Sequence, residues 1–237
     1  MPTLQFCNLS RTPPVIKTEK LNLCHISCDL ACRESVTKAS EEVYSFLSRS
    51  VPAGRILLIN NSGFGSYGAF PEGILSHELE LIDVNIRGLI HLTGLLMPAL
   101  KERGGAIIHV ASTAAFQPTP FMATYGASKA FVLHWGLALN EELKGSGVRS
   151  LVVCPGPTAT QFFQRAGLAE GTVGESLSMS AEEVVMQSLQ ALAESKSLVV
   201  TGWKNKISAT AGGMAPKRLA TWIAGKVIGR YRMKGAK

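Results

Sequence analysis

Two kinds of hydrophobic pattern alternate along the chain. Short aliphatic and β-branched runs, closed by glycine, proline or polar residues, predict strands at residues 4–9, 23–26, 55–59, 106–110, 148–153 and 198–200. Apolar residues spaced three and four apart predict helices at residues 34–49, 78–103, 125–143 and 180–193. Strands that alternate with helices are typical of an α/β domain with a parallel sheet.

Local signals refine two of these helices. Gly88 and Pro98 are expected to bend or interrupt the helix at 78–103. The stretch Ser180-Ala-Glu-Glu183 has the capping-box pattern, in which a serine and a glutamate each satisfy a free backbone N–H at the start of a helix. No linker or shift in composition divides the main body, so we expect one domain at 1–202 and a C-terminal extension at 203–237.

The extension has its own pattern. Residues 216–234 predict an amphipathic helix whose apolar face carries Leu219, Trp222, Ile223, Val227 and Tyr231. Capping of the substrate pocket or of a subunit interface is the favoured use of this helix. Contact with an anionic membrane surface is the second, because tryptophan and tyrosine among basic residues suit the lipid headgroup region.

Composition and charge narrow the class of protein. The 237 residues are 46% hydrophobic and 17% charged, which excludes a disordered chain. The net charge of +7 comes from the extension, which holds nine lysines and arginines and no acidic residue, whereas residues 1–202 hold 15 basic and 17 acidic side chains. Nucleic-acid binding is therefore the least favoured use of the basic helix.

The compartment follows from what the chain lacks. No apolar run approaches the roughly 18 residues of a membrane span, and the first residues lack the pattern of a signal peptide. Five cysteines, an odd number, indicate a reducing compartment, so we expect a cytoplasmic protein, with peripheral membrane contact as the alternative. Cys24, Cys28 and Cys32 beside His25 are not predicted to bind a metal, because paired Cys-x-x-Cys spacing is absent.

Polar residues gather where the predicted strands end, which is where open parallel sheets bind ligands. Asp29, Asn60, Ser112 and the turn at 155–160 all have this position. Tyr125 and Lys129 share one helical face, and a neighbouring ammonium should lower the pKa of the phenol toward a range useful for acid/base chemistry. Alone, this spacing fits an ordinary pair on a helix surface equally well.

Several further motifs accompany that pair in the same order. They are Asn60-Asn61-Ser62-Gly63 after a strand, Asn85 in Asp83-Val84-Asn85, Ser112 placed 13 residues before Tyr125, and Pro155-Gly156-Pro157-Thr158-Ala159-Thr160 after the next strand. Together they resemble the short-chain dehydrogenase/reductase family. The stretch 64–163 resembles a bacterial-type branch of largely uncharacterised oxidoreductases. The resemblance implies a Rossmann-like, doubly wound parallel sheet and an enzyme that depends on NAD(P).

The resemblance also implies roles for individual residues. Hydride would pass between a nicotinamide and a carbonyl or alcohol carbon, with Tyr125 as general acid/base. Lys129 would lower the pKa of Tyr125 and bind the nicotinamide ribose, Ser112 would position the substrate oxygen, and Asn85 would hold a water. The implied cofactor-binding residues are Asp29 and Leu30 at the adenine, Asn60, Ser62, Gly63, Tyr125, Lys129, and Pro155, Gly156, Thr158 and Thr160 beside the nicotinamide.

Cofactor choice depends on the end of the first strand. Ser10 and Arg11 stand where members that prefer NAD place an acidic residue. An arginine beside hydroxyl groups suits a 2′-phosphate, which favours NADP(H) over NAD(H). The alternative is a solvated loop arginine.

The most recognisable segment of the family is missing. No glycine precedes Gly54, so the strand and the T-G-x-x-x-G-x-G turn that cradle the pyrophosphate are absent, a unit of about 25–30 residues. In a sheet ordered 3-2-1-4-5-6 the missing strand is central. A unit encoded upstream is the favoured explanation. The alternatives are a first strand that moves into the central position, or a catalytically silent interaction protein that associates with membranes through its basic helix.

The expected partners follow from these assignments. They are a small carbonyl or alcohol substrate and a second copy of the chain in a homo-oligomer. Phenylalanines in 64–70, 116–121 and 162–163 favour a lipophilic ketone or alcohol, and the same residues suit the core or a dimer interface equally well.

Overall fold

The computed structural model describes residues 4–15, 22–51, 53–167 and 178–234. Its strands are β1 (Phe6–Ser10), β2 (Leu23–Ser27), β3 (Ile56–Asn60), β4 (Gly105–Val110), β5 (Val148–Cys154) and β6 (Leu198–Val200). Its helices are α1 (Arg33–Ser50), α2 (Leu75–Ile82), α3 (Leu89–Arg103), α4 (Ala123–Glu142), α5 (Phe162–Arg165), α6 (Ala181–Ala193), α7 (Trp203–Met214) and α8 (Lys217–Lys234). The predicted α/β class is confirmed, with parallel pairing throughout.

Two of the three local signals predicted for the helices are present. The helix expected at 78–103 is built from α2, a π-helical segment η2 (Asp83–Gly88) and α3, so the interruption expected near Gly88 is present. Pro98 does not interrupt α3, which continues through this residue. The capping box is confirmed: Ser180 Oγ accepts from the Glu183 N–H at 3.1 Å, and Glu183 Oε2 accepts from the Ser180 N–H at 3.1 Å.

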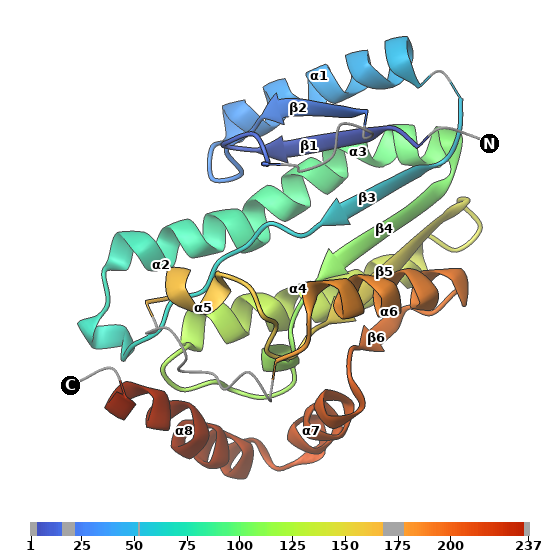
Figure 1. Cartoon of the computed structure of the whole chain (residues 1–237). Coiled ribbons are helices and arrows are strands. Elements are labelled where there is room, and N and C mark those ends of the chain that lie inside the picture. Colours follow the sequence, from blue (N-terminus) through green and yellow to red (C-terminus); the bar gives the residue numbers. More distant parts are fainter. Residues whose placement is uncertain (1–3, 16–21, 52, 168–177, 235–237) are drawn as a thin grey trace.

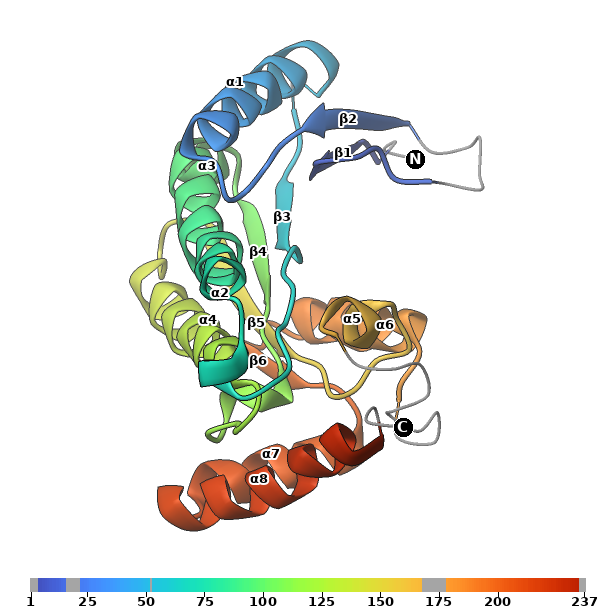
Figure 2. The same ribbon diagram turned by 90° about the vertical axis from the view of Figure 1, so that its left-hand side faces the viewer.

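The strands form two separate sheets. β1 pairs with β2, and a second sheet has the order β3-β4-β5-β6. β1 is the strand of the small sheet nearer to β3 in both views (Figures 1 and 2). Within the described ranges, neither strand has a ladder partner on the side facing the other. This agrees with the predicted lack of a central strand, and it contradicts the alternative in which the first strand takes the central position.

Helices cover the sheets unequally. α1, α3 and α4 lie over one face, and α6 lies on the other (Figure 2). The largest core cluster joins the first group to the strands through Val36, Leu96, Leu100 and Ile107, all of them buried. On the opposite face, Leu57 and Ile59 of β3 remain 42% and 51% exposed.

The C-terminal extension packs against loops of the main body. A Cβ added at Gly225 would lie 3.4 Å from Pro120, and one at Gly229 would lie 3.1 Å from Phe121. The Tyr67 hydroxyl donates to the Ile228 carbonyl oxygen at 3.0 Å. The helix predicted at 216–234 is confirmed as α8, although the Tyr231 side chain lies outside what the structure describes. In the part of the chain that is described, no helix has the length and apolar character needed to cross a membrane.

Candidate active site

The site lies where β3, β4 and β5 end. Because these strands are parallel, their carboxyl ends share one edge of the sheet, and the loops that follow them converge on the first turns of α4. Thr113 N–H donates to the Pro155 carbonyl oxygen at 2.9 Å, which joins the loops after β4 and β5. Four of the predicted residues, Asn85, Ser112, Tyr125 and Lys129, are neighbours at this edge.

Tyr125 is buried in the middle of this group. Its side chain is 7% exposed, and the Phe162 ring of α5 covers it with a centroid separation of 5.2 Å. Burial raises the pKa of Tyr125 to about 12, while a hydrogen bond with Ser112 acts in the opposite direction. The predicted lowering of this pKa was therefore wrong: removal of the phenol from water outweighs any favourable neighbour.

Lys129 lies one turn along the same helix and is 5% exposed. Its Nζ donates to the Val110 carbonyl oxygen at 2.8 Å, at the end of β4, and lies 5.9 Å from the centroid of the Tyr125 ring. Burial lowers the pKa of Lys129 to about 8, since the ammonium is harder to charge away from water. The amine therefore loses its charge at a lower pH than an exposed lysine does.

Asn85 connects the π-helical segment to the loop after β3. Its Nδ2 donates to the Phe64 carbonyl oxygen at 3.0 Å, and its Oδ1 accepts from the Phe64 N–H at 3.1 Å. Nδ2 also donates to Ser128 Oγ at 3.1 Å, so the amide spans two elements. Segments of π-helix are frequent at functional sites, where they place a side chain that a regular helix would misdirect.

Gly63 marks the closest approach of the loop to this group. A Cβ at this position would lie 2.9 Å from Asn85 Oδ1 and 3.3 Å from Lys129 Nζ. Ser62 and Gly63 are exposed, so the backbone here forms an open ledge beside the buried amine. A ledge without a side chain leaves room for a ligand atom to approach both polar groups.

Asn60 has a different environment from the one expected for a cofactor-binding residue. It is 8% exposed, and its Nδ2 donates to Thr93 Oγ1 at 2.9 Å and to His109 Nδ1 at 3.1 Å. Burial lowers the pKa of His109 to about 4, which keeps the imidazole neutral and its Nδ1 able to accept. The Asn60 side chain thus ties β3 to α3 and β4.

Ser112 and Cys154 lie near Tyr125, and both affect the pKa of its phenol. Ser112 precedes the short 3₁₀ helix η3 (Thr113–Ala115), and its Oγ accepts from the Ala114 N–H at 3.1 Å. Cys154 is fully buried, and burial raises the pKa of its thiol to about 12, so it stays neutral. No role was predicted for this cysteine from the sequence; the usable signal was its place at a strand end directly before Pro155.

The turn after β5 is held from both sides. A Cβ on Gly156 would collide with the Asn205 side chain of α7, so any other residue there would require Asn205 to move. Thr158 Oγ1 donates to the Gly156 carbonyl oxygen at 3.1 Å, and Thr160 Oγ1 accepts from the Phe162 N–H at 3.3 Å. The turn expected beside the nicotinamide therefore also positions the ring that covers Tyr125.

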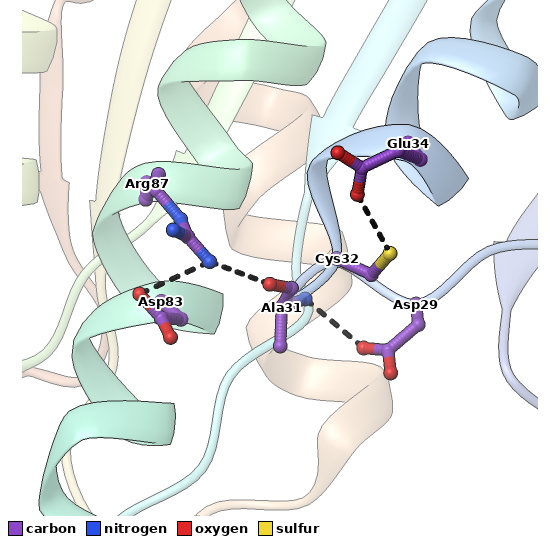
Figure 3. Close-up of polar contacts among 6 residues, drawn as sticks. All are labelled: Asp29, Ala31, Cys32, Glu34, Asp83 and Arg87. Carbon is purple, nitrogen blue, oxygen red and sulfur yellow. Dashed lines mark hydrogen bonds and ion pairs between the residues drawn. The ribbon is translucent and has the colours of Figure 1, made fainter.

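The predicted adenine-binding pair lies at the β2–α1 loop. Asp29 Oδ1 accepts from the Ala31 N–H at 3.0 Å, and Arg87 of η2 donates to the Ala31 carbonyl oxygen at 2.6 Å while pairing with Asp83 at 3.2 Å (Figure 3). Leu30 packs so closely on Gly88 that a Cβ there would collide with the Leu30 carbonyl oxygen. Asp29 and Leu30 are thus fixed against the same π-helical segment that carries Asn85.

Arg11 lies at the exposed end of β1. Its Nη1 is 3.6 Å from Glu80 Oε1 of α2, and the two side chains are 69% and 42% exposed. Ser10 Oγ donates to the Thr12 carbonyl oxygen at 2.7 Å, which shapes the turn. An exposed ion pair is weak, so Glu80 competes with any other anion for Arg11 without blocking access.

Comparisons with known proteins agree with this geometry. Residues 8–171 match the family model described as short chain dehydrogenase. The ketoacyl reductase HetN of Nostoc sp. is 40% identical over 101 residues, 42% of this chain and 35% of HetN. The uncharacterized oxidoreductase YbbO of Escherichia coli K12 is 33% identical over 135 residues, 56% of this chain and 49% of YbbO. The chain therefore spans about a third to a half of the length of these relatives.

Solved structures extend the similarity to the fold. A short-chain dehydrogenase from Sphingobium yanoikuyae in complex with NADPH aligns with a TM-score of 0.67 at 29% identity, over 76% of this chain and 68% of that one. Other structures of the same fold, at 18% and 20% identity, hold NADP and NAD respectively.

Proposed function

The chain belongs to the short-chain dehydrogenase family, and on that premise we propose that it is an NADP(H)-dependent oxidoreductase that interconverts a carbonyl and an alcohol. The observation that carries the proposal is the shared burial of Tyr125 and Lys129, 7% and 5% exposed, at the sheet edge beside Ser112. A phenol and an amine buried together at a strand-end site are suited to proton transfer rather than to solvation.

The residues present fit the nicotinamide half of the cofactor. Lys129 Nζ would donate to the ribose hydroxyl groups, and the side-chain-free ledge at Gly63 leaves space beside that amine. Asn85 holds the ledge in place through its two bonds to Phe64. Bound NADPH would supply the hydride.

Proton transfer falls to Tyr125. With a pKa of about 12, the phenol is protonated at neutral pH, and it would donate the proton from Oη to the carbonyl oxygen during reduction. A charged Lys129 would stabilise the phenolate left behind. Ser112 Oγ would hold the substrate oxygen near Oη. The protonated phenol is the form of Tyr125 that reduction of a carbonyl requires.

The preference for NADP(H) rests on Arg11. Its guanidinium would bind the 2′-phosphate in exchange for the exposed Glu80 carboxylate. None of the described residues before Gly54 is a glycine, so this part of the chain offers no glycine-rich turn for the pyrophosphate. We therefore expect the chain as given to bind NADPH weakly.

The proposed substrate is a lipophilic ketone. Phe162 and Phe163 stack edge to face with centroids 5.5 Å apart, and Phe162 lies against Tyr125. An apolar carbonyl compound would replace water beside these rings, and the buried phenol would then meet the carbonyl oxygen. The catalytically silent alternative gains no observation in its favour.

Titration of protein fluorescence with NADPH, followed by NADPH oxidation assays with a panel of lipophilic ketones, tests the proposal. The wild-type chain should bind NADPH saturably and oxidise it with at least one ketone. Tyr125→Phe should keep binding and lose turnover, whereas Lys129→Ala should lose both. Saturable binding with equal turnover by Tyr125→Phe would refute the proposed role of the phenol.

A further inference from the structure

The two C-terminal helices expose an unusual amount of apolar surface. Seven large side chains on α7 and α8 are between 47% and 82% exposed, namely Trp203, Ile207, Met214, Leu219, Trp222, Ile223 and Val227. We call this set the outward apolar face. α7 and α8 lie together at one end of the molecule, away from α1 (Figures 1 and 2). Exposed apolar patches on a soluble protein mark surfaces that bind something.

The direction of this face follows from how α8 packs. Its contacts with the main body come from small residues: Gly225 meets Pro120, Gly229 meets Phe121, and Ala220 is 5% exposed. Leu219, Trp222, Ile223 and Val227 recur at spacings of three and four on the other side of the helix. Leu219, Trp222, Ile223 and Val227 therefore do not cover the pocket, and the other favoured use of this helix, a subunit interface, stays a prediction.

Basic groups accompany the exposed tryptophans. Lys226 Nζ lies 3.8 Å from the centroid of the Trp222 ring, and Lys204 Nζ lies 5.7 Å from that of Trp203. Residues 203–237 contain nine lysines and arginines and no aspartate or glutamate. Tryptophan and aliphatic side chains bordered by lysine and arginine match the boundary between the headgroups and acyl chains of an anionic bilayer.

We propose that the outward apolar face docks the protein on an anionic lipid membrane. A second copy of the chain fits this face poorly, because two such faces would bring like charges together. Nucleic acid offers phosphates for the basic groups and little that would bury four large aliphatic and aromatic side chains of α8. A bilayer surface satisfies both features at once.

α8 also borders a cavity of the main body. A cavity of about 550 Å³ lies between α8 and the main body, bordered by Lys217 and Thr221 of the helix and by Phe116, Pro120 and Ala123 next to the start of α4. α4 carries Tyr125, so a helix held at the membrane also borders the loop before the proposed catalytic residue. This surface assignment stands apart from the proposed reaction and survives if the chain proves inactive.

Co-sedimentation of the full chain with vesicles tests the proposal. Wild-type protein should sediment with phosphatidylcholine vesicles containing phosphatidylglycerol and stay in solution with phosphatidylcholine alone. Trp222→Ser/Ile223→Ser/Val227→Ser should weaken binding by at least about tenfold, because it removes most of the α8 part of the face. Lys226→Gln/Arg230→Gln/Lys204→Gln should weaken binding at low salt, and the binding that remains should depend less on salt than that of wild type.

A matched variant separates this face from exposed apolar surface in general. Val185, Met186 and Leu189 of α6 are 54%, 67% and 44% exposed, and Val185→Ser/Met186→Ser/Leu189→Ser should sediment like wild type. Circular dichroism checks that each variant is folded, and the emission of Trp203 and Trp222 should shift to shorter wavelength with anionic vesicles. Equal binding to neutral vesicles, no binding, or a wild-type dimer that the α8 variant makes monomeric would each overturn the proposal.

Discussion

Gly63 and Asn85 approach each other so closely that a Cβ at position 63 would lie 2.9 Å from Asn85 Oδ1. The Oδ1 and Nδ2 atoms of Asn85 are both hydrogen-bonded to the backbone of Phe64, so the amide has little freedom to move away. A bare backbone at residue 63 is therefore required for the arrangement of the site, and side-chain atoms there would displace the amide or the Lys129 amine.

Gly63→Ala should lower the rate of carbonyl reduction by about tenfold or more, since an extra methyl group occupies the ledge beside Lys129. Steady-state NADPH oxidation measures this. Gly94→Ala is the control: no heavy atom lies within 4 Å of a Cβ at that helical position, and alanine should be neutral or stabilising by up to ~1 kcal/mol. If Gly63→Ala keeps full activity, the ledge has no role in ligand binding.

The contribution of Lys129 to the free energy of unfolding should rise between about pH 8 and pH 10. Lys129 has a pKa lowered to about 8, below the 10.5 of an unburied lysine, so in this window the unfolded chain holds the proton that the native state has lost from this group. The gain from Lys129 should be on the order of 2 to 3 kcal/mol. The raised pKa values of Cys7 and Cys154 from about pH 9 and of Tyr125 from about pH 10, each about 12, act in the opposite direction, because the native state then holds the extra protons.

Urea unfolding across this pH range is the measurement. The difference in the free energy of unfolding between wild type and Lys129→Met should change by this amount between pH 8 and pH 10, while the difference between wild type and Lys144→Met, which changes an exposed lysine, should stay constant. A constant difference for Lys129→Met would show that its amine has an ordinary pKa in the folded protein.

Removal of the ring above Tyr125 should lower the pKa of the phenol. Phe162→Ala exposes Tyr125 to water, and its pKa should move from about 12 toward the 10.0 of a solvated tyrosine. Spectroscopic titration of phenolate, with the same titration in a Tyr125→Phe background subtracted, isolates this group. Phe163→Ala provides the comparison, since its ring packs on Phe162, and a shift of equal size there would point to general loosening of α5.

Arg11→Asp should shift cofactor preference toward NADH. Loss of the guanidinium should weaken NADPH binding by about tenfold or more, as expected for a lost charge-assisted contact with the 2′-phosphate. Glu80→Gln should strengthen NADPH binding a few-fold by freeing Arg11, and Arg49→Asp makes the same charge change at the far end of α1 as a control. Fluorescence titrations with NADPH and NADH measure the two affinities. If Arg11→Asp binds NADPH as tightly as wild type, Arg11 does not bind the 2′-phosphate.

Periodicity predicted the strands and most of the helices, because each depends on local spacing of apolar residues, whereas α5 and α7 were not predicted. The sequence also predicted that Ser112, Tyr125 and Lys129 lie close together, since parallel strands bring their carboxyl ends to one edge of the sheet. The pKa of Tyr125 did not follow, because it depends on Phe162, which reaches the ring from a separate loop. Similarly, nothing near Asn60 in the sequence indicates that Thr93 and His109 hold its amide.

The C-terminal helix shows a further limit. Spacing identifies which residues share a face of α8, and this was correct for Leu219, Trp222, Ile223 and Val227. Which of two faces packs inward depends on the shape of the surface it meets, here the loop around Pro120 and Phe121. A helix face made of glycine and alanine lets the helix backbone lie closer to this loop than a face with large side chains would.

The strands form two separate sheets, and this division affects how the protein unfolds. β1 and β2 are joined to the remainder through packing of α1 on α3 and not through backbone ladders. Packing without a shared backbone ladder gives weaker mutual support, so we expect the described residues before β3 to unfold as a separate unit. Amide hydrogens of β1 and β2 should accordingly exchange with solvent well before those of β4 and β5, and the chain should lose its order in two steps.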